Sequence, residues 1–502
     1  MKRTADVCII VEGAYPYVHG GVSSWVHNLI TALDPLSFHV VALKADETNQ
    51  PSRFSMPSNV LSLSEIALQP AQYQSPHGPG ASATIGALEQ PLKSLLCHGN
   101  GQDFRQVIDA LNTHKGFADR ATLMNSEAAF GMLQRMYDST VPECSFLQYF
   151  WSWRALVGGL FSVLLADLPP ARVYHAISTG YAGLLLARAV VETGRHGILT
   201  EHGIYTNERR IEIAMAEWLA DRGKPSLEIV KRRRDLRDVW LDAFIGYSRT
   251  CYELSSRIIT LYRGNQAMQL RDGAPSERMA LIPNGVDVAL FSKIVREARP
   301  KRPTIALIGR VVQIKDVKTF IRAAALLRVK VPQLRALVMG PTEEDPTYFR
   351  ECREMVTHLD LGQCVEFTGQ VQLVDYLGVV DILVLTSISE AQPLVLLEAG
   401  AAGIPAVATD VGACRDIIEG HPDERPALGA GGFTTPLANP QATAKAVADL
   451  LLDPSLMNHC GSVMRQRTAR YYGKEQTNES YRALYESHME LKVDPLKSQV
   501  AA

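Results

Sequence analysis

Apolar strand-like runs alternate with helical stretches throughout the second half of the chain, and the connections between them are short. A typical helical stretch is 316–329, "DVKTFIRAAALLRV". The strand-like runs, rich in Val, Ile and Leu, are 304–310, 335–340, 365–369, 381–387 and 405–410. This alternation predicts a doubly wound parallel sheet with helices on both of its faces.

The first half of the chain repeats the pattern, with longer interruptions. Helices are predicted to begin near Val22 and to cover 182–193. The predicted strands are 7–13, 38–43, 172–177, 197–203, 243–248 and 279–287. The charged stretch 296–303 carries two prolines and no apolar periodicity, so it is the predicted junction between two α/β domains. The expected N-terminal domain is therefore 1–295.

Two insertions interrupt the strands of the first half. The stretch 45–100 is rich in Pro, Ser and Gln and lacks periodicity, so it is predicted to be irregular. An insertion of about 100–167 is predicted to be mainly helical. Its aromatic run 146–153, "FLQYFWSW", is interpreted as core, with a carbohydrate-stacking surface as the alternative. Three further helices are predicted within 440–490.

Composition and charge exclude several other classes of protein. A net charge of -2 argues against a whole-chain device for binding nucleic acid or anionic membranes. The eight cysteines include no Cys-x-x-Cys pair, which favours neither a disulfide framework nor a zinc site. The apolar run 7–11 is too short for a signal peptide, and 155–165 is too short to span a bilayer, so a soluble, cytoplasmic chain is expected.

Cationic side chains follow the first strand of the second domain. That strand ends in Gly309 and Arg310, and Lys315 comes five residues later. In the stretch "TSISEAQPLVLLEAG", Pro393 fits the first turn of a helix whose free N–H groups can bind an anion. Arginine and lysine beside such a helix start predict a diphosphate site. The alternative is that both are surface charges.

Two carboxylates flank the start of the same helix. Glu398 lies about one and a half turns inside it, where a carboxylate can accept two hydrogen bonds from a ribose diol. Glu390 precedes the helix and can reach hydroxyls of a group attached to the distal phosphate. Capping and ordinary surface charge are the alternatives for this pair.

Together these residues resemble the retaining GT-B glycosyltransferases of family four. The elements that carry the resemblance are Glu390 with Glu398, Arg310 with Lys315, the glycine loop Gly20-Gly21-Val22 and the segment 282–287, "IPNGVD". The resemblance implies two Rossmann-like domains facing each other across a cleft, with the UDP-sugar held by the C-terminal domain, 296–470. It also implies that a last helix, within 471–502, crosses back to the N-terminal domain.

A closer resemblance concerns the cytoplasmic glycosyltransferases of Pel exopolysaccharide synthesis. It is carried by 11–30, "VEGAYPYVHGGVSSWVHNLI", by 200–213, "TEHGIYTNERRIEI", and by 409–420, "TDVGACRDIIEG". It implies transfer from UDP-glucose or a UDP-N-acetylhexosamine to a growing polysaccharide, and docking onto an inner-membrane synthase complex. The helical insertion is the expected docking surface.

The family resemblance also implies a role for each site residue. Arg310 and Lys315 would neutralise the leaving diphosphate, Glu398 would hold the ribose, and Glu390 would contact donor-sugar hydroxyls near the reacting carbon. His202 would line the donor-sugar pocket; a satisfied core histidine is the alternative. The further residues expected to contact the donor are Gly20, Gly21, Val22, Asn284, Gly369, Gln370, Val371, Leu394 and Val395.

The chain has no Asp-x-Asp motif, so no essential metal and no cofactor other than the donor are expected. Two other functions remain open from the sequence. One is a non-catalytic nucleotide-sugar-binding subunit that regulates a membrane polysaccharide synthase. The other is a GT-B transferase that acts on a small or lipid-linked acceptor.

Overall fold

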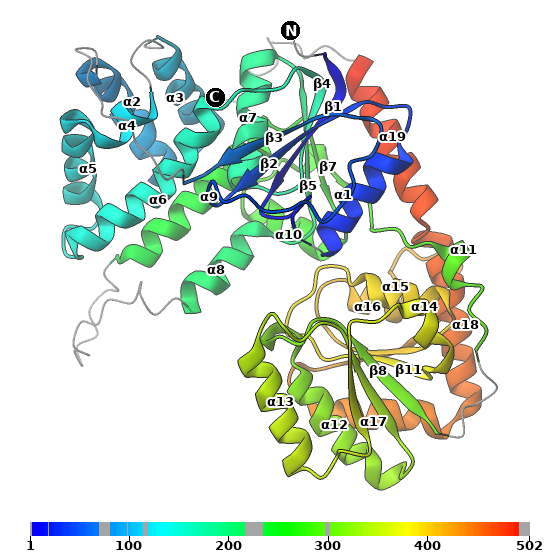
Figure 1. Ribbon diagram of the computed structural model, residues 1–502. Helices are drawn as coiled ribbons and strands as arrows, with labels where there is room; N and C mark the ends of the chain where they lie inside the picture. Colours follow the sequence, from blue (N-terminus) through cyan, green and yellow to red (C-terminus); the bar gives the residue numbers. More distant parts are fainter. Residues whose placement is uncertain are drawn as a thin grey trace. The chain divides into compact units, whose positions relative to one another are not determined.

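The computed structural model describes residues 3–18, 20–69, 81–97, 99–113, 119–215, 234–296 and 302–490 (Figure 1). The chain forms two compact units. The first consists of Met1–Leu281 with Tyr481–Ala502, and the second of Ile282–Ser480. Residues 282–295 therefore belong to the second unit by their contacts. Both units are built around a parallel sheet, so the predicted doubly wound α/β class is confirmed.

The first unit contains a seven-stranded sheet in the order β3-β2-β1-β4-β5-β6-β7. Every neighbouring pair is parallel. The strands are β1 (Ala5–Glu12), β2 (Phe38–Lys44), β3 (Val60–Ala67), β4 (Ala171–Ala176), β5 (His196–Glu201), β6 (Arg257–Thr260) and β7 (Met279–Leu281). The apolar run of β1 is fully buried between helices, as expected for a central parallel strand.

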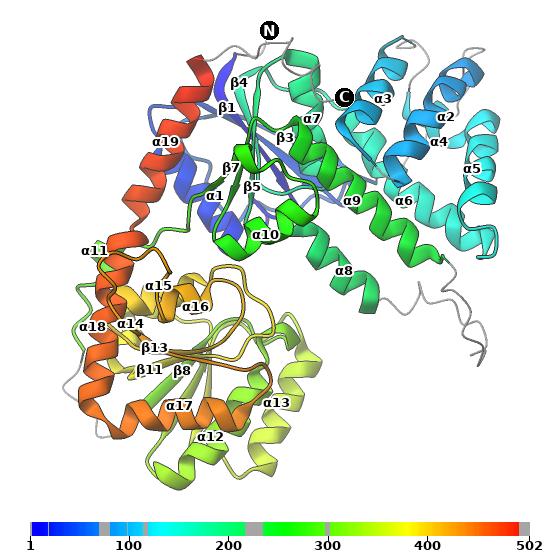
Figure 2. The ribbon, with the colours of Figure 1, turned by 180° about the vertical axis from the view of Figure 1, so that it is seen from behind.

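Helices cover the first sheet and form an insertion beside it. The covering helices include α1 (Gly21–Ala32), α7 (Tyr181–Thr193), α9 (Leu236–Leu254) and α10 (Arg263–Arg271), and α8 (Tyr205–Met215) packs against α9. The insertion consists of α2 (Ala81–Cys97), α3 (Gly101–Thr113), α4 (Arg120–Asn125), α5 (Glu127–Thr140) and α6 (Phe146–Leu165). Figure 2 shows α2 to α6 grouped together beyond α7 and α9. Helices therefore occupy the region where helix was predicted.

Three local predictions for the first unit are wrong. The stretch 45–100 is not irregular throughout, because it contains β3 and α2; residues 70–80 lie outside the described part. The run 243–248 is part of α9 and not a strand, since its buried residues recur at helical spacing along that helix. The strand predicted over 279–287 ends at Leu281.

The aromatic run in α6 divides between core and surface. Tyr149 and Trp153 are buried, as the core interpretation predicts. Leu147 and Trp151 are 65% and 61% exposed. The helix therefore presents one apolar face to the interior and leaves a second set of apolar side chains open to solvent.

The second unit contains a six-stranded sheet in the order β10-β9-β8-β11-β12-β13. Its strands are β8 (Thr304–Ile308), β9 (Arg335–Met339), β10 (Val365–Gly369), β11 (Ile382–Leu385), β12 (Ala406–Thr409) and β13 (Gly432–Thr435), all in parallel pairs. Chain order reverses between β8 and β11. In such sheets, ligands bind at the carboxyl ends of the strands beside this reversal.

The helices of the second unit pack on both faces of this sheet. They include α12 (Val317–Lys330), α13 (Pro346–His358), α14 (Leu373–Tyr376), α15 (Leu394–Ala401), α16 (Cys414–Ile418), α17 (Pro440–Leu452) and α18 (Pro454–Tyr471). With α19 (Lys474–Glu490), the last two are the three helices predicted within 440–490. No helix among the described residues is long and apolar enough to cross a bilayer.

The contacts of α19 divide between the units. Residues up to Ser480 belong to the second unit and those from Tyr481 to the first. Within the first unit, the Tyr485 hydroxyl lies 2.6 Å from Nδ1 of His175, a buried residue of β4. The Tyr481 hydroxyl lies 3.1 Å from that of Thr200 in β5. Buried aromatic residues therefore hold the end of α19 on the first sheet.

Candidate functional site

Two loops meet at the reversal of strand order in the second sheet. One follows β8 and the other follows β11. The Thr386 hydroxyl donates to the carbonyl of Asp316 at 2.8 Å, and the N–H of Ile388 donates to the carbonyl of Ile314 at 2.8 Å. These bonds bring the predicted cations and carboxylates to one edge of the sheet.

Lys315 and Glu390 form an ion pair at this edge. Nζ of Lys315 lies 2.5 Å from Oε1 of Glu390, and the side chains are 20% and 12% exposed. The hydroxyl of Ser387 donates to the same carboxylate oxygen at 2.6 Å. Because this pair is mostly screened from water, its attraction is stronger than that of a surface pair.

Arg310 has a different partner. Its guanidinium lies 2.5 Å from the carboxylate of Glu344, and both side chains are 51% exposed. The structure therefore brings Lys315 to Glu390 and pairs Arg310 with a residue that the sequence analysis did not consider. An exposed pair of this kind contributes little to stability, so the guanidinium can leave it for a ligand at low cost.

The helix α15 begins beside the Lys315–Glu390 pair. Pro393 is its N-cap, one residue before the first turn in which it was predicted. The N–H groups of Leu394 and Val395 have no hydrogen-bond partner among the residues that the structure describes. Unpaired amides at a helix start carry a partial positive charge, which suits an anion.

Glu398 is a mostly buried carboxylate in α15. Burial among apolar neighbours raises its pKa to about 7. Within the described parts of the chain, no side chain or backbone group pairs with this carboxylate. The side chain keeps some access to solvent, so its oxygens are free to accept hydrogen bonds from a ligand.

Asn284 contacts the loop that precedes α15. Its backbone N–H donates to Oε1 of Gln392 at 2.6 Å. Both residues are only 6% exposed. The side-chain Oδ1 of Asn284 is buried and has no partner within the described residues. The predicted donor residue Asn284 therefore lies beside the Glu390 loop, and Gln392 is a site residue that sequence reasoning missed.

The loop after β10 lies at the same end of the sheet. Gly369 adopts φ +69°, a left-handed conformation that favours glycine. Its carbonyl accepts from the N–H of Gly340 at 2.9 Å, and a Cβ on Gly340 would come within 2.1 Å of the Gly309 carbonyl oxygen. Gln370 and Val371 follow directly, so this loop, which is expected to contact the donor, neighbours the loop that carries Arg310.

The glycine loop of the first unit has no structural need for glycine. Gly20 is the N-cap of α1 with an extended φ of -179°, and Gly21 and Val22 begin the helix. A Cβ on Gly20 or Gly21 would meet no atom within 4 Å. Close approach of a ligand would explain both glycines, and that role stays a prediction.

His202 lies after β5 in the first unit. Burial lowers its pKa to about 4, so the imidazole is neutral near pH 7. Its Nε2 is buried and has no partner among the described residues. Its ring meets that of Trp25 edge-on, with the centroids 4.6 Å apart. His202 is therefore not a satisfied core histidine, and a donor-pocket role remains open.

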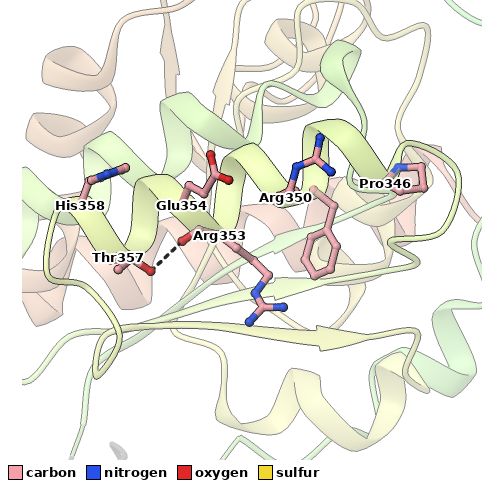
Figure 3. A pocket seen from close by; sticks show the side chains of 7 residues that line it. Pro346, Arg350, Arg353, Glu354, Thr357 and His358 are labelled. Carbon is pink, nitrogen blue, oxygen red and sulfur yellow. Dashed lines mark hydrogen bonds between the residues drawn. The ribbon is translucent and has the colours of Figure 1, made fainter.

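A hollow of about 580 Å³ lies elsewhere in the second unit, along α13. Figure 3 shows its lining, which comes from one exposed helix face and includes Arg350, Arg353 and His358. It contains none of the predicted site residues. Among the described residues, no three His, Cys, Asp or Glu side chains are placed to hold a metal ion.

Comparisons with known proteins match each half of the chain separately. A family model described as "Domain of unknown function (DUF3492)" matches residues 5–277. A second, described as "Glycosyl transferases group 1", matches residues 302–453.

Curated relatives include D-inositol 3-phosphate glycosyltransferase 2 of Catenulispora acidiphila. This protein is 27% identical over 292 residues, which are 55% of this chain and 62% of the relative. The MMP alpha-(1->4)-mannosyltransferase of Mycolicibacterium hassiacum is 26% identical over 293 residues, 58% of this chain and 64% of that one. The match thus spans less than two thirds of either relative.

Solved structures share the fold over nearly the whole chain. Sucrose-phosphate synthase from Thermosynechococcus elongatus aligns with a TM-score of 0.59 and 17% identity, covering 97% of this chain and 99% of that one. HepE from Anabaena in complex with UDP aligns with a TM-score of 0.57 and 13% identity, covering 96% and 99%. The chain therefore belongs to the family of the domain of unknown function DUF3492, and it has a GT-B fold in which residues 302–453 match the glycosyl transferases group 1 model.

Proposed function

We propose that the chain is a retaining, metal-independent glycosyltransferase that moves a sugar from a UDP-sugar to a growing exopolysaccharide. The observation that carries this proposal is the arrangement around α15. An ion-paired lysine lies in the loop after β8, and two unpaired amides and a partly buried carboxylate without a partner lie in α15. A nucleoside diphosphate presents the matching groups, since its phosphates are anionic and its ribose donates two hydrogen bonds.

The relatives support the same reaction class. HepE, which shares the fold, has been crystallised with UDP and with UDP-glucose. In our proposal, Lys315 and the start of α15 stabilise the departing diphosphate without a metal ion. Arg310 leaves Glu344 to join them. Glu398 binds the ribose, and Glu390 exchanges Lys315 for hydroxyls of the donor sugar.

The proposed acceptor rests on three segments of the sequence, 11–30, 200–213 and 409–420, which carry the resemblance to glycosyltransferases of Pel exopolysaccharide synthesis. In those segments the chain is similar to PelF, so we propose a Pel-type polysaccharide as acceptor and an inner-membrane synthase complex as partner. Trp151 and Leu147 of the insertion are exposed apolar side chains that a partner protein could cover. A variant with both replaced by serine should lose co-purification with membranes but keep turnover.

Turnover of a labelled UDP-sugar panel by the purified protein tests the proposal directly. Transfer to polymer, with UDP-glucose and the UDP-N-acetylhexosamines compared side by side, would identify the donor. Transfer to a small or lipid-linked acceptor alone would replace the polymer assignment. Binding without turnover, even with partner proteins supplied, would favour the regulatory subunit.

The two glutamates should fail in different ways. Glu398→Gln should weaken UDP binding by about 10- to 100-fold, because a ribose diol loses the charged acceptor of its hydrogen bonds. Glu390→Gln should leave UDP binding within a few-fold but lower kcat. Calorimetry and initial rates measure the two effects. The opposite result, in which Glu390→Gln weakens UDP binding and Glu398→Gln lowers only kcat, would contradict these two roles.

Binding of UDP-glucose should depend on pH through Glu398. Its pKa of about 7 in the free protein means that the carboxyl group is increasingly protonated below pH 7. Because the bound ribose requires the ionised form, affinity should fall about tenfold from pH 8 to pH 6. The diphosphate of UDP-glucose does not titrate in this range. Titration calorimetry of Glu398→Gln should show a flat profile, and an equal slope in both proteins would contradict the prediction.

A further inference from the structure

The loop 386–393, called the donor loop below, is tied to a distant segment through one side chain. Gln392 accepts the N–H of Asn284 at 2.6 Å, and both residues are buried. The next residue, Pro393, has no N–H to offer. A buried N–H that loses its acceptor is expensive, so this bond restrains the donor loop where α15 begins.

The segment that supplies the N–H is itself fixed at the junction of α18 and α19. The N–H of Val286 donates to the carbonyl of Tyr472 at 2.8 Å, and the N–H of Lys474 donates to the carbonyl of Val286 at 3.0 Å. The hydroxyl of Thr477 donates to the carbonyl of Pro283 at 3.0 Å. The segment 282–287 therefore follows the start of α19 if that helix moves.

Both crossings of the chain between the two units lie beside this segment. One falls between Leu281 and Ile282, directly before it, and the other between Ser480 and Tyr481, one turn after Thr477. A continuous series of hydrogen bonds thus leads from both crossings, through Asn284 and Gln392, to the donor loop.

We infer that Gln392 is a positioning residue for the proposed reaction. It fixes the position of the donor loop, and with it Glu390 and the start of α15, relative to the segment 282–287. That segment follows the backbone conformation at the two chain crossings. The inference rests on the proposed function for the identity of the donor. The tie itself stands on contacts within the second unit alone. A change at the crossings would shift the grip on the diphosphate without touching any residue that contacts it.

Removing the acceptor atom Oε1 of Gln392 tests whether its hydrogen bond with Asn284 positions the donor loop. Gln392→Met keeps the length of the side chain but leaves the Asn284 N–H unpaired. It should weaken UDP binding about tenfold and speed amide exchange in a peptide spanning 386–396. Gln392→Glu retains an acceptor oxygen and should restore both properties.

A substitution at Thr477 tests whether the attachment of the segment 282–287 to α19 also affects the donor loop. Thr477→Val removes the bond to Pro283 and should speed exchange in the donor loop and weaken UDP binding several-fold. Thr443→Val is the matched control, because Thr443 is also buried, also in the second unit, and donates to the Asn439 carbonyl at 3.0 Å. It should change neither property. In the double variant with Gln392→Met, Thr477→Val should cause no further change in exchange or UDP binding, because both substitutions interrupt the same series of hydrogen bonds.

Unchanged exchange in Gln392→Met, or equal effects of the two threonine variants, would overturn the inference. Additive effects in the double variant would also do so. Exchange is measured without ligand, so it decides the coupling even if the unaltered protein binds no nucleotide sugar. A failure of the unaltered protein to bind any nucleotide sugar would contradict the proposed function and not this inference. If Gln392→Met does not fold, Thr477→Val and its control still decide the matter.

Discussion

Replacing Lys315 by methionine is expected to lower kcat/KM for sugar transfer by about 100- to 1,000-fold, the usual effect of removing one group that stabilises developing charge. The substitution takes away the cation placed 2.5 Å from Glu390. It removes positive charge where the diphosphate would leave, and it strands a carboxylate that is 12% exposed. Initial rates and UDP calorimetry on the same preparation measure both consequences.

Lys318→Met is the matched control for this experiment. Lys318 lies three residues later and pairs with Glu351 at 2.7 Å, with side chains 28% and 46% exposed. A surface pair of this kind is worth at most about 1 kcal/mol and takes no part in the proposed site, so activity should stay within about twofold. Full activity of Lys315→Met, or equal losses in both variants, would remove Lys315 from the mechanism.

Arg467→Met is expected to lower the free energy of unfolding of the second unit by about 3–5 kcal/mol, because it leaves a buried carboxylate unpaired. Arg467 is 1% exposed. Its guanidinium donates to both oxygens of Glu424 at 2.6 and 2.9 Å and to the carbonyl of Ile418 at 2.9 Å. Differential scanning calorimetry measures the loss.

Two features of the chain sharpen that measurement. The five tryptophans all lie before residue 282, so tryptophan fluorescence follows the first unit and should change little. Arg470→Met, at an exposed position on the same helix, should cost less than about 0.5 kcal/mol. Adding Glu424→Gln to Arg467→Met should recover part of the stability. Equal losses at Arg467 and Arg470 would show that the buried ion pair is not needed.

Much of the site could be predicted because it lies at strand ends. Parallel strands place the residues that follow them on one edge, so the positions of Lys315 and Glu390 after two strands already predicted that both lie at that edge. The choice of partner for Arg310 could not be predicted. Glu344 follows a different strand, and nothing in the local pattern of either residue marks the other.

The role of Gln392 could not be predicted from the sequence either. A glutamine before a proline is an ordinary loop residue in sequence. Its importance comes from the backbone N–H of Asn284, which folding brings within 2.6 Å. The error at 243–248 has a similar origin, since six residues were too few to distinguish helical from strand spacing until α9 was seen as a whole.

The sequence alone predicted the parallel α/β class, most of the strands, the motifs at their ends and the start of the helix that carries Glu398, because periodicity and turn residues act over a few neighbours. Only the tertiary structure decided which charges are paired and which carboxylate stays alone. Pairing and burial depend on contacts between segments far apart in the chain, and these contacts exist only after folding.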